Sequence, residues 1–436
     1  MAHPLVRLAD GTVRQVGPLT GTQVWTIPGR SHRPLPVHSG DGAPPAPEDP
    51  EHADDLCAFC PARYLETTPE KSRLVRRGQE VLVSERRSAP RLSDDVADVR
   101  RFANLFEIVP AASWRTNHGF VAPADVAAWA RDYLADPVGR EHVLALTAAR
   151  EAAGGVLAPA AGDEAALARV TEDFMAGSHD VVVARRHLRA DARTTADLAA
   201  AGTLTPLEHA DFIDFTVEAL RDTYARQPAA RYVSVFQNWL RAAGATFDHL
   251  HKQLVGIDAH GPQTQREIAM LREEPDLYNR AVIDLVRADQ LVIASNDGAV
   301  AVAGVGHRHP SIEIYSTAPV QLPWEHDAAQ RRAVSDLLHA MHAATGPQVA
   351  TNEEWHHRPP DVVEPMPWRI VLKWRLQVPA GFEGGTKIYV NTIDPWAIKQ
   401  RMTQELLALR ESGAIAPLRI GTECSPDDAD LRYARG

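Results

Sequence analysis

Cysteine is scarce in this sequence, with three residues among 436. A chain of this length with so few cysteines is not held together by disulfides, so its fold must depend on a packed core. The hydrophobic content of 44% is ample for such a core. Two of the cysteines, Cys57 and Cys60, form the motif "CAFC", which indicates metal binding or redox chemistry. Cys424 lies in a polar tail, and we expect no role for it.

Long hydrophobic runs are also missing. No apolar stretch approaches the roughly 20 residues needed to cross a bilayer. The opening "MAHPLVRLADG" lacks the charged start and apolar centre of a signal peptide, so we expect a cytoplasmic protein. Acidic residues outnumber basic ones by 57 to 46, giving a net charge of −11. This balance argues against a general binder of nucleic acid or of acidic membranes, while leaving room for a local phosphate site.

Glycine-rich phosphate loops and dinucleotide fingerprints are absent as well, and what remains is an alternation of strand and helix signals. Thr205, Pro206 and Glu208 predict a capped helix start, as do Asp394 and Pro395 near the end of the chain. Residues 368–377 alternate in polarity, which predicts a half-buried antiparallel strand with Arg369, Lys373, Arg375 and Gln377 on its polar face. Ala-rich residues 111–176 resemble a helical insertion. We expect an α+β fold with two halves, the second beginning near residue 260.

The segment "FQNWLRAAGATFDHLHKQLVG" (236–256) places His249, His251 and Gln253 at every second position. On a strand these side chains share one face, with neighbours roughly 6.5–7 Å apart. They could be satisfied polar residues on a partly exposed strand. Their register, the preceding glycine-containing turn and the lone CxxC make a functional site the better interpretation. For the CxxC itself, a redox pair and inert packing stay open beside a metal site.

The same segment resembles the active-site signature of the galactose-1-phosphate uridylyltransferases, the transferase branch of the histidine-triad superfamily. It departs from the signature at Leu240, Thr246 and Leu250. Further likenesses follow in the family's order: "GPLTGTQVWTIPGRSHRP", "CAFCP", "RFANLFEIV", "GSHDVVVARRH" and "AGFEGGTKIYVN". The chain is therefore identified as a divergent member, which implies two histidine-triad-like domains, 1–259 (catalytic, with the 111–176 insertion) and 260–436.

The resemblance implies that His251 is a nucleophile that attacks the α-phosphorus of a nucleotide and carries the nucleotide covalently. Gln253 stands where hydrolase relatives have a third histidine. Its amide donates to a phosphoryl oxygen but delivers no proton to a leaving group, which favours transfer between phosphates over hydrolysis. Asn238 and Thr246 match positions that bind phosphate or hold the histidine loop.

A structural zinc ion, one per chain, is also implied. Its ligands would be two thiolates and two imidazoles, from Cys57, Cys60, His187 and His249, which fill a tetrahedral site. The segment "VVVARRH", which ends at His187, is one residue shorter than the corresponding segment in the family. His179 is therefore the alternative fourth ligand.

Other matched positions concern the substrate. Arg30 and Arg33 correspond to phosphate-binding arginines, although a solvated loop would also explain them. Phe102, Asn104 and Leu105 match a nucleoside-binding segment in which Leu105 replaces an Asp, and this leaves the base open. The sugar contacts would come from Phe382 and Glu383, in a segment that the partner of a homodimer supplies in some relatives.

A second metal found in some relatives is not expected, because "PWRIV" replaces the usual H-W-H; Glu267, His356 and His357 would be its remnants. The sequence thus predicts a nucleotidyltransferase that moves a nucleoside monophosphate, with UMP preferred, between sugar 1-phosphates. The first alternative is phosphorolysis of a nucleotide sugar or dinucleoside polyphosphate. The second is a zinc-stabilised nucleotide-binding protein without catalysis. The expected partners are a nucleotide sugar, a sugar phosphate or phosphate, and a second copy of the chain in a homodimer.

Overall fold

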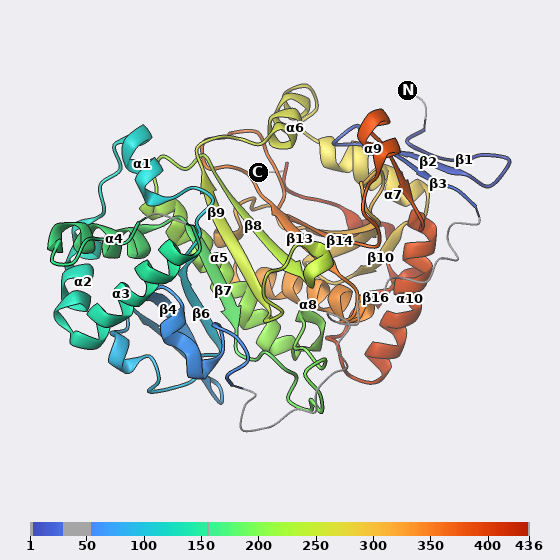
Figure 1. Ribbon diagram of the computed structural model, residues 1–436. Coiled ribbons are helices and arrows are strands. Elements are labelled where there is room, and N and C mark those ends of the chain that lie inside the picture. Colours follow the sequence, from blue (N-terminus) through green and yellow to red (C-terminus); the bar gives the residue numbers. More distant parts are fainter. Residues whose placement is uncertain (1–2, 29–53, 155–156, 435–436) are drawn as a thin grey trace.

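The computed structural model describes residues 3–28, 54–154 and 157–434 of the chain. Its centre is a twelve-stranded sheet in which every neighbouring pair is antiparallel (Figure 1). In spatial order its strands are β16 (Arg419–Ile420), β10 (Val292–Ser295), β11 (Ala299–Ala303), β12 (Ser311–Ser316), β14 (Arg369–Trp374), β13 (Thr351–His356), β8 (Tyr232–Trp239), β9 (His251–Ile257), β7 (His179–Ala184), β6 (Val99–Ala103), β4 (Glu70–Arg77) and β5 (Glu80–Glu85). The predicted α+β class with mostly antiparallel sheets is confirmed.

Strands from the first part of the chain occupy one half of this sheet, and strands from the second part occupy the other. The two sets meet where β8 pairs with β13, from Phe236 opposite Glu354 to Trp239 opposite Thr351. The halves therefore share one continuous hydrogen-bonded sheet. Their division at residues 259 and 260 stays a prediction.

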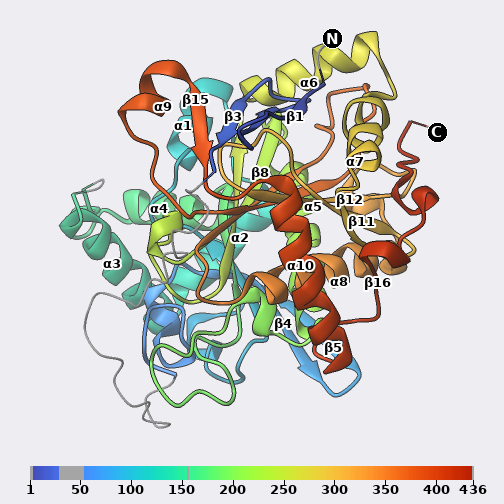
Figure 2. The same ribbon diagram turned by 90° about the vertical axis from the view of Figure 1, so that its right-hand side faces the viewer.

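Helices flank the sheet. They are α1 (Ala111–His118), α2 (Ala124–Ala135), α3 (Pro137–Ala152), α4 (Glu164–Ala176), α5 (Pro206–Arg226), α6 (Pro262–Glu273), α7 (Asp284–Ala288), α8 (Ala328–Thr345), α9 (Gly381–Thr386) and α10 (Pro395–Glu411). The first four lie within the predicted insertion and group at one end of the molecule, while α10 lies at the other (Figure 1) and crosses the view in Figure 2. None of the helices in the described ranges combines the length and the apolar content needed to cross a membrane.

The two predicted capped helix starts are confirmed. Thr205 Oγ1 accepts a hydrogen bond from the backbone N–H of Glu208, and Glu208 Oε2 accepts one from the N–H of Thr205, so α5 begins in a capping box. Asp394 caps α10 through the N–H of Ala397. Such caps satisfy backbone donors that the first helical turn leaves without partners.

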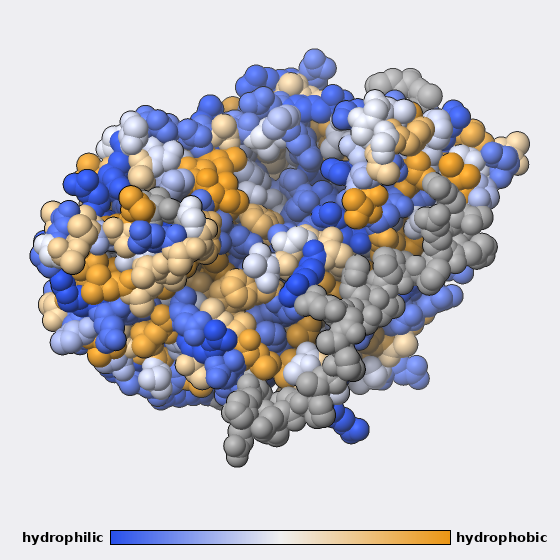
Figure 3. Space-filling model, in the orientation of Figure 1, coloured by the Kyte–Doolittle hydropathy of each residue, from blue (hydrophilic) through white to orange (hydrophobic). Residues whose placement is uncertain are grey.

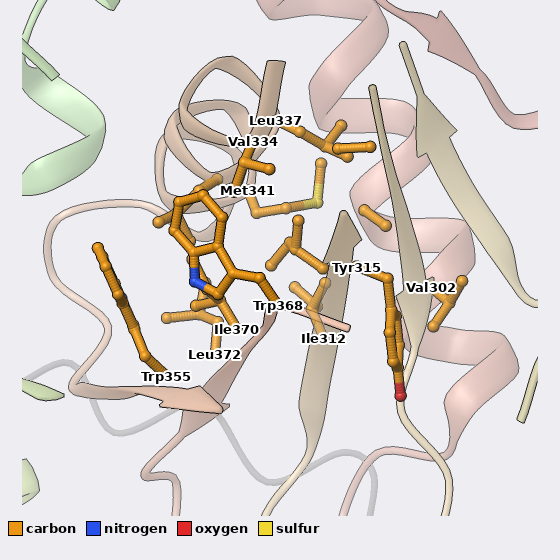
Figure 4. Close-up of a cluster of buried hydrophobic side chains, with 14 of the residues drawn as sticks. Val302, Ile312, Tyr315, Val334, Leu337, Met341, Trp355, Trp368, Ile370 and Leu372 are labelled. Atoms are coloured by element: carbon orange, nitrogen blue, oxygen red, sulfur yellow. The ribbon is translucent and has the colours of Figure 1, made fainter. Parts of the chain in front are cut away.

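One face of the sheet packs on α5, α8 and α10. In the second half this core brings Ile312, Trp368, Ile370 and Leu372 against α8, as Figure 4 shows. The polar face predicted for residues 368–377 is wrong at Arg369. Its side chain is 2% exposed, and its guanidinium lies 3.0 Å from the Glu267 carboxylate.

A smaller sheet joins the beginning of the chain to its last third. β1 (Leu5–Arg7), β2 (Val13–Val16) and β3 (Gln23–Thr26) are antiparallel, and β15 (Ile388–Asn391) pairs with β3 in parallel. The segment "AGFEGGT" forms α9 directly before β15.

Candidate functional site

Strands β7, β8 and β9 build a polar site on the face of the sheet that α5 and α8 do not cover. His251 and Gln253 of β9 point to this face, opposite Val183 and Val181 of β7. The residue between them, Lys252, points to the core and is 0% exposed. Its ammonium donates to the Glu353 carboxylate of β13, so a buried ion pair ties the strand that bears His251 to the second half of the sheet. The strand begins at His251, and His249 lies in the loop before it.

His251 is held in one tautomer. Its Nδ1 lies 2.7 Å from the backbone oxygen of His249. A carbonyl only accepts, so Nδ1 carries the proton and Nε2 keeps a lone pair. Burial lowers the pKa of His251 to about 4, and the ring is therefore neutral near pH 7. A neutral imidazole with a fixed lone pair is a nucleophile.

The amide of Gln253 is oriented by His179. The backbone N–H of Ile108 donates to His179 Nδ1 over 3.0 Å, so the proton of this ring lies on Nε2. Nε2 is 2.9 Å from Gln253 Oε1 and donates to it. The amide oxygen is thus occupied, and the NH₂ group of Gln253 is left as the donor beside His251.

The amide of Asn238, on β8, is also oriented by a hydrogen bond to its oxygen, in this case from β13. Asn352 Nδ2 donates to Asn238 Oδ1 over 2.7 Å, and Arg375 Nη1 holds Asn352 Oδ1 at 2.6 Å. The register that pairs Phe236 with Gln253, continued by two residues, brings Asn238 opposite His251. On this register the amides of Asn238 and Gln253 share the face of the sheet with His251, and both have their NH₂ groups left as donors, which suits an anionic group bound on this face.

A cavity of about 350 Å³ opens beside His251. Its size falls in the range of small-molecule sites. Phe59, which lies between the two cysteines of "CAFC", packs against the His251 ring with 5.3 Å between centroids and against Phe247 with 4.3 Å. Among the residues predicted from the sequence, the cavity is lined by Phe102, Asn104, Leu105, Thr246, His251 and Gln253.

Behind His251 lies a cluster of four potential metal ligands, Cys57, Cys60, His187 and His249, whose ligand atoms are all within 4.8 Å of one another. The two sulfurs are 3.8 Å apart, and Nδ1 of His249 lies 3.6 Å from Cys57 Sγ and 3.8 Å from Cys60 Sγ. Nδ1 of His187 lies 3.6 Å from Cys60 Sγ. A tetrahedral ion with bonds of about 2.3 Å to sulfur and 2.0–2.1 Å to nitrogen requires about 3.8 Å between sulfurs and about 3.6 Å between sulfur and nitrogen. The cluster fits such an ion.

The ligand chemistry of the cluster is also suitable. His249 Nε2 donates to the Ala184 carbonyl over 2.8 Å, which leaves Nδ1 unprotonated toward the sulfurs. The hydrogen bond between the sulfurs lowers the pKa of Cys60 to about 2 and raises that of Cys57, so the pair shares one proton when no cation is bound. His187 is the fourth member, and His179 is not part of the cluster. The alternative assignment of His179 is wrong because its two ring nitrogens face Ile108 and Gln253.

Other predicted residues lie elsewhere. Arg30 and Arg33 fall outside the described residues. Phe382 and Glu383 lie on α9, where Phe382 packs on Trp25 with 6.5 Å between ring centroids and the Glu383 carboxylate caps the helix at Ala380. Neither lines the cavity beside His251.

The expected remnants of a second metal site do not gather into a ligand cluster in the described part of the chain. Glu267 binds the Arg369 guanidinium and the Tyr278 hydroxyl. His357 stacks on Tyr232 and contacts the Tyr224 hydroxyl. The buried guanidinium of Arg369 therefore binds the Glu267 carboxylate, the group that a second metal ion would need as a ligand.

Three contributors to the site were missed from the sequence: Phe59, Asn352, and His179 in its contact with Gln253. The aromatic residue inside "CAFC" and the first histidine of "HDVVVARRH" were visible signals for two of them. Asn352 carries no local signal, because it acts only through the pairing of β13 with β8.

Comparison with solved structures shows the fold. An ADP-glucose phosphorylase from Arabidopsis thaliana, solved with bound ADP-glucose, matches over 90% of this chain and 97% of its own, with 17% identity and a TM-score of 0.57. A galT-like protein from the same plant matches over 80% of this chain and 92% of its own, with 17% identity and a TM-score of 0.53. These matches confirm the resemblance to uridylyltransferase-like proteins at the level of the fold. The low sequence identity is that expected of a divergent member.

Comparison with curated proteins gives no match. A family model described as "Domain of unknown function (DUF4921)" matches residues 8–433, nearly the whole chain. The protein therefore belongs to the DUF4921 family.

Proposed function

We propose that this protein transfers a nucleoside monophosphate from a nucleotide sugar to a phosphate-bearing acceptor through a covalent nucleotidyl group on His251. The observation that carries the proposal is the arrangement around this ring. It is neutral, its Nδ1–H is held by the His249 carbonyl, and the amide oxygens of Gln253 and Asn238, on the same face of the sheet, are each held by a hydrogen bond, which leaves both NH₂ groups as donors.

In the first step the Nε2 lone pair attacks the α-phosphorus of the donor. A P–N bond forms, the bond from phosphorus to the bridging oxygen breaks, and the sugar 1-phosphate leaves with the electron pair. The Nδ1–H stays on the ring, bonded to the His249 carbonyl. In the second step an acceptor phosphate oxygen attacks, the P–N bond breaks, and His251 returns to its neutral form.

The amides of Gln253 and Asn238 support transfer rather than hydrolysis. Their NH₂ groups stabilise the charge that develops on the phosphoryl oxygens. Neither amide has a proton to give to a leaving group or removes one from water, and a departing phosphate needs no proton. An incoming phosphate is already ionised, so it reacts without a general base, whereas water does not.

Zinc is the ion that we propose for the cluster of Cys57, Cys60, His187 and His249, since two thiolates and two imidazoles are a common set for structural zinc. When bound, it would cross-link the "CAFC" loop to the loop before β9. His249 would transmit this restraint to His251. It supplies a ligand nitrogen to the cluster, and its backbone carbonyl holds the His251 ring.

The acceptor distinguishes the two enzymatic candidates. Transfer between sugar 1-phosphates, with UMP as the carried group, is the function expected from the sequence. Phosphorolysis is the second candidate. It is supported by the apolar Leu105 in the cavity where uridine-specific relatives carry an Asp, and by the bound ADP-glucose of the structurally similar phosphorylase.

The proposal is tested with α-³²P-labelled UDP-glucose, ADP-glucose, GDP-mannose and diadenosine tetraphosphate. One donor is expected to leave acid-labile, base-stable label on the protein, and this donor names the base. Discharge of the label by glucose 1-phosphate or by inorganic phosphate then identifies the acceptor. If none of the four donors leaves label, the proposed transfer is wrong, and the result favours the alternative of a zinc-stabilised nucleotide-binding protein without catalysis.

His179 gives a prediction about positioning. In His179→Ala the Gln253 amide loses the donor that fixes its oxygen, so we expect kcat for transfer to fall about 10- to 100-fold with a smaller change in KM. In the Gln253→Ala background the same substitution is expected to have little further effect. His118→Ala, at an exposed histidine paired with Asp258, is the control. Losses that add independently would show that His179 acts on stability alone.

A further inference from the structure

Strand β5 forms an open edge of the twelve-stranded sheet. It pairs with β4 from Glu80 opposite Arg77 to Glu85 opposite Ser72, and it is the last strand in the order. Its other side has no backbone hydrogen-bond partner among the described residues. In Figure 2 the hairpin of β4 and β5 projects at the lower edge of the molecule. The strand therefore presents a row of N–H and C=O groups that can pair with another strand.

The apolar side chains of β5 are exposed together with its backbone edge. Val81, Leu82 and Val83 are 41%, 39% and 58% exposed. On the side of α5, a cavity of about 500 Å³ is lined by both valines and by Phe215 of that helix, so α5 does not cover them. The face in Figure 3 mixes hydrophilic and hydrophobic residues, and its hollow below α6 is mainly hydrophilic. Apolar area alone does not single out an interface on that face, whereas β5 combines apolar side chains with a free backbone edge.

The opposite edge of the sheet is protected. The last strand there, β16, has only two residues, and its Ile420 is 2% exposed. Helix α10 packs against both β16 and its neighbour β10. Short and covered edge strands are a usual protection against pairing with other chains, and β5 lacks this protection.

The pattern of β5 is compatible with pairing to a second copy of itself. Residues directly opposite each other on antiparallel strands point to the same face of a sheet. A two-fold axis perpendicular to the sheet leaves each face on its own side, so odd positions lie opposite odd ones and even positions opposite even ones. The fully overlapped pairing, which would set Glu80 against Glu85 of the second copy, is thereby excluded.

One two-fold register places residues of similar character opposite each other. With the axis at Leu82, this residue faces its own counterpart, and Val81 lies opposite Val83 of the second copy. Glu80 then lies opposite Ser84 of the second copy, where a carboxylate acceptor meets a hydroxyl donor. Pairs of β-branched residues and pairs of acceptor and donor are the ones that stabilise neighbouring strands.

We propose that two copies of this chain associate through antiparallel pairing of their β5 strands, with the two-fold axis at Leu82, so that one sheet runs through both copies. Moving the axis to Val83 would instead set the Glu85 carboxylate against the apolar Val81 of the second copy. A contact between two short strands is at the small end of protein interfaces, so the pairing depends on concentration. Strands β4, β6 and β7 separate β5 from β9, and the inference is therefore independent of the chemistry at His251.

Sedimentation velocity of the full chain, at concentrations from about 1 to 100 µM, tests the pairing. The wild type is expected to shift from one 47.7 kDa chain toward two as the concentration rises. It is expected to stop at two, because a two-fold contact closes on itself. A chain that stays monomeric throughout, or that grows beyond two copies, would overturn the proposal.

Two double variants test the register. Val81→Lys with Val83→Lys sets ammonium groups against each other across the axis and is expected to weaken pairing at least about 10-fold. Val81→Lys with Val83→Glu sets an ammonium at position 81 opposite a carboxylate at position 83 of the second copy and is expected to restore pairing. Both positions are exposed, so both variants should fold, which thermal unfolding checks. Val121→Lys, at an 80% exposed residue between α1 and α2, is the control and should pair as the wild type does.

The outcomes separate this contact from other surfaces and from the proposed transfer. A dimer that both double variants leave intact forms through another surface, and the proposal is then wrong. Equal loss of pairing in the two double variants contradicts the register at Leu82 and with it the proposed contact. Labelling of His251 should be the same in all of these variants, so failure of the transfer and failure of the pairing are distinguishable.

Discussion

Replacing His251 by alanine is expected to reduce nucleotidyl transfer about ten-thousand-fold or more and to abolish covalent labelling. The reason is that the side chain supplies the atom that bonds to phosphorus, and neither neighbouring amide is a nucleophile. The measurements are label per chain after acid and base treatment, and single-turnover kinetics with the best donor. The thermal midpoint should change little, because the ring borders a cavity and its loss removes no salt bridge.

The matched control for this prediction is His3→Ala, which changes an exposed histidine paired with Asp289 near the start of the chain. It is expected to label as the wild type does. Label that persists at full stoichiometry in His251→Ala would place the nucleophile elsewhere and overturn the mechanism. His251→Gln adds a variant of similar size, so that loss of activity is not confused with loss of packing.

Disrupting the cluster of Cys57, Cys60, His187 and His249 is expected to have the second large effect, on metal content, stability and labelling. Cys60 is 0% exposed and lies within 3.8 Å of three other ligand atoms. We expect Cys60→Ala to lower the zinc content from about one per chain to near zero and the free energy of unfolding by about 3–5 kcal/mol, a fall in Tm of about 5 °C or more. Labelling should fall with it, because His249, another ligand of the cluster, supplies the carbonyl that sets the tautomer of His251.

Metal analysis of the native and the variant protein, together with thermal unfolding, checks this prediction. Cys424→Ala removes the cysteine outside the cluster and should leave both zinc content and Tm unchanged. Native protein with far less than one zinc per chain would refute the assignment of the metal. Full labelling by a zinc-free Cys60→Ala variant would refute the link between the cluster and His251.

The sequence predicted correctly the features that depend on residues close together in the chain. Period-two spacing placed His251 and Gln253 on one face, and the capping residues of α5 and α10 acted as expected, because each of these features depends on neighbours within a few positions. The four metal ligands were predicted through resemblance, since nothing local joins Cys57 to His249. Their meeting in space is what the structure adds.

What could not be predicted depends on register between distant strands. The contact of His179 with Gln253 spans 74 positions, and that of Asn352 with Asn238 spans 114. Arg369 was expected on a polar face because alternation does not reveal Glu267, its ion-pair partner, which lies 102 positions away. Strand pairing fixes such contacts only after the order of strands in the sheet is known.

The junction of β8 with β13 has a consequence for synthesis of the protein. Asn238 is made long before Asn352, and its amide stays unoriented until β13 has left the ribosome and added itself to the edge of β8. A nascent chain that ends before residue 351 would contain His251 and Gln253 but would lack the second oriented amide and the partner of buried Lys252. Under the proposed mechanism, the site at His251 would therefore be completed only late in translation.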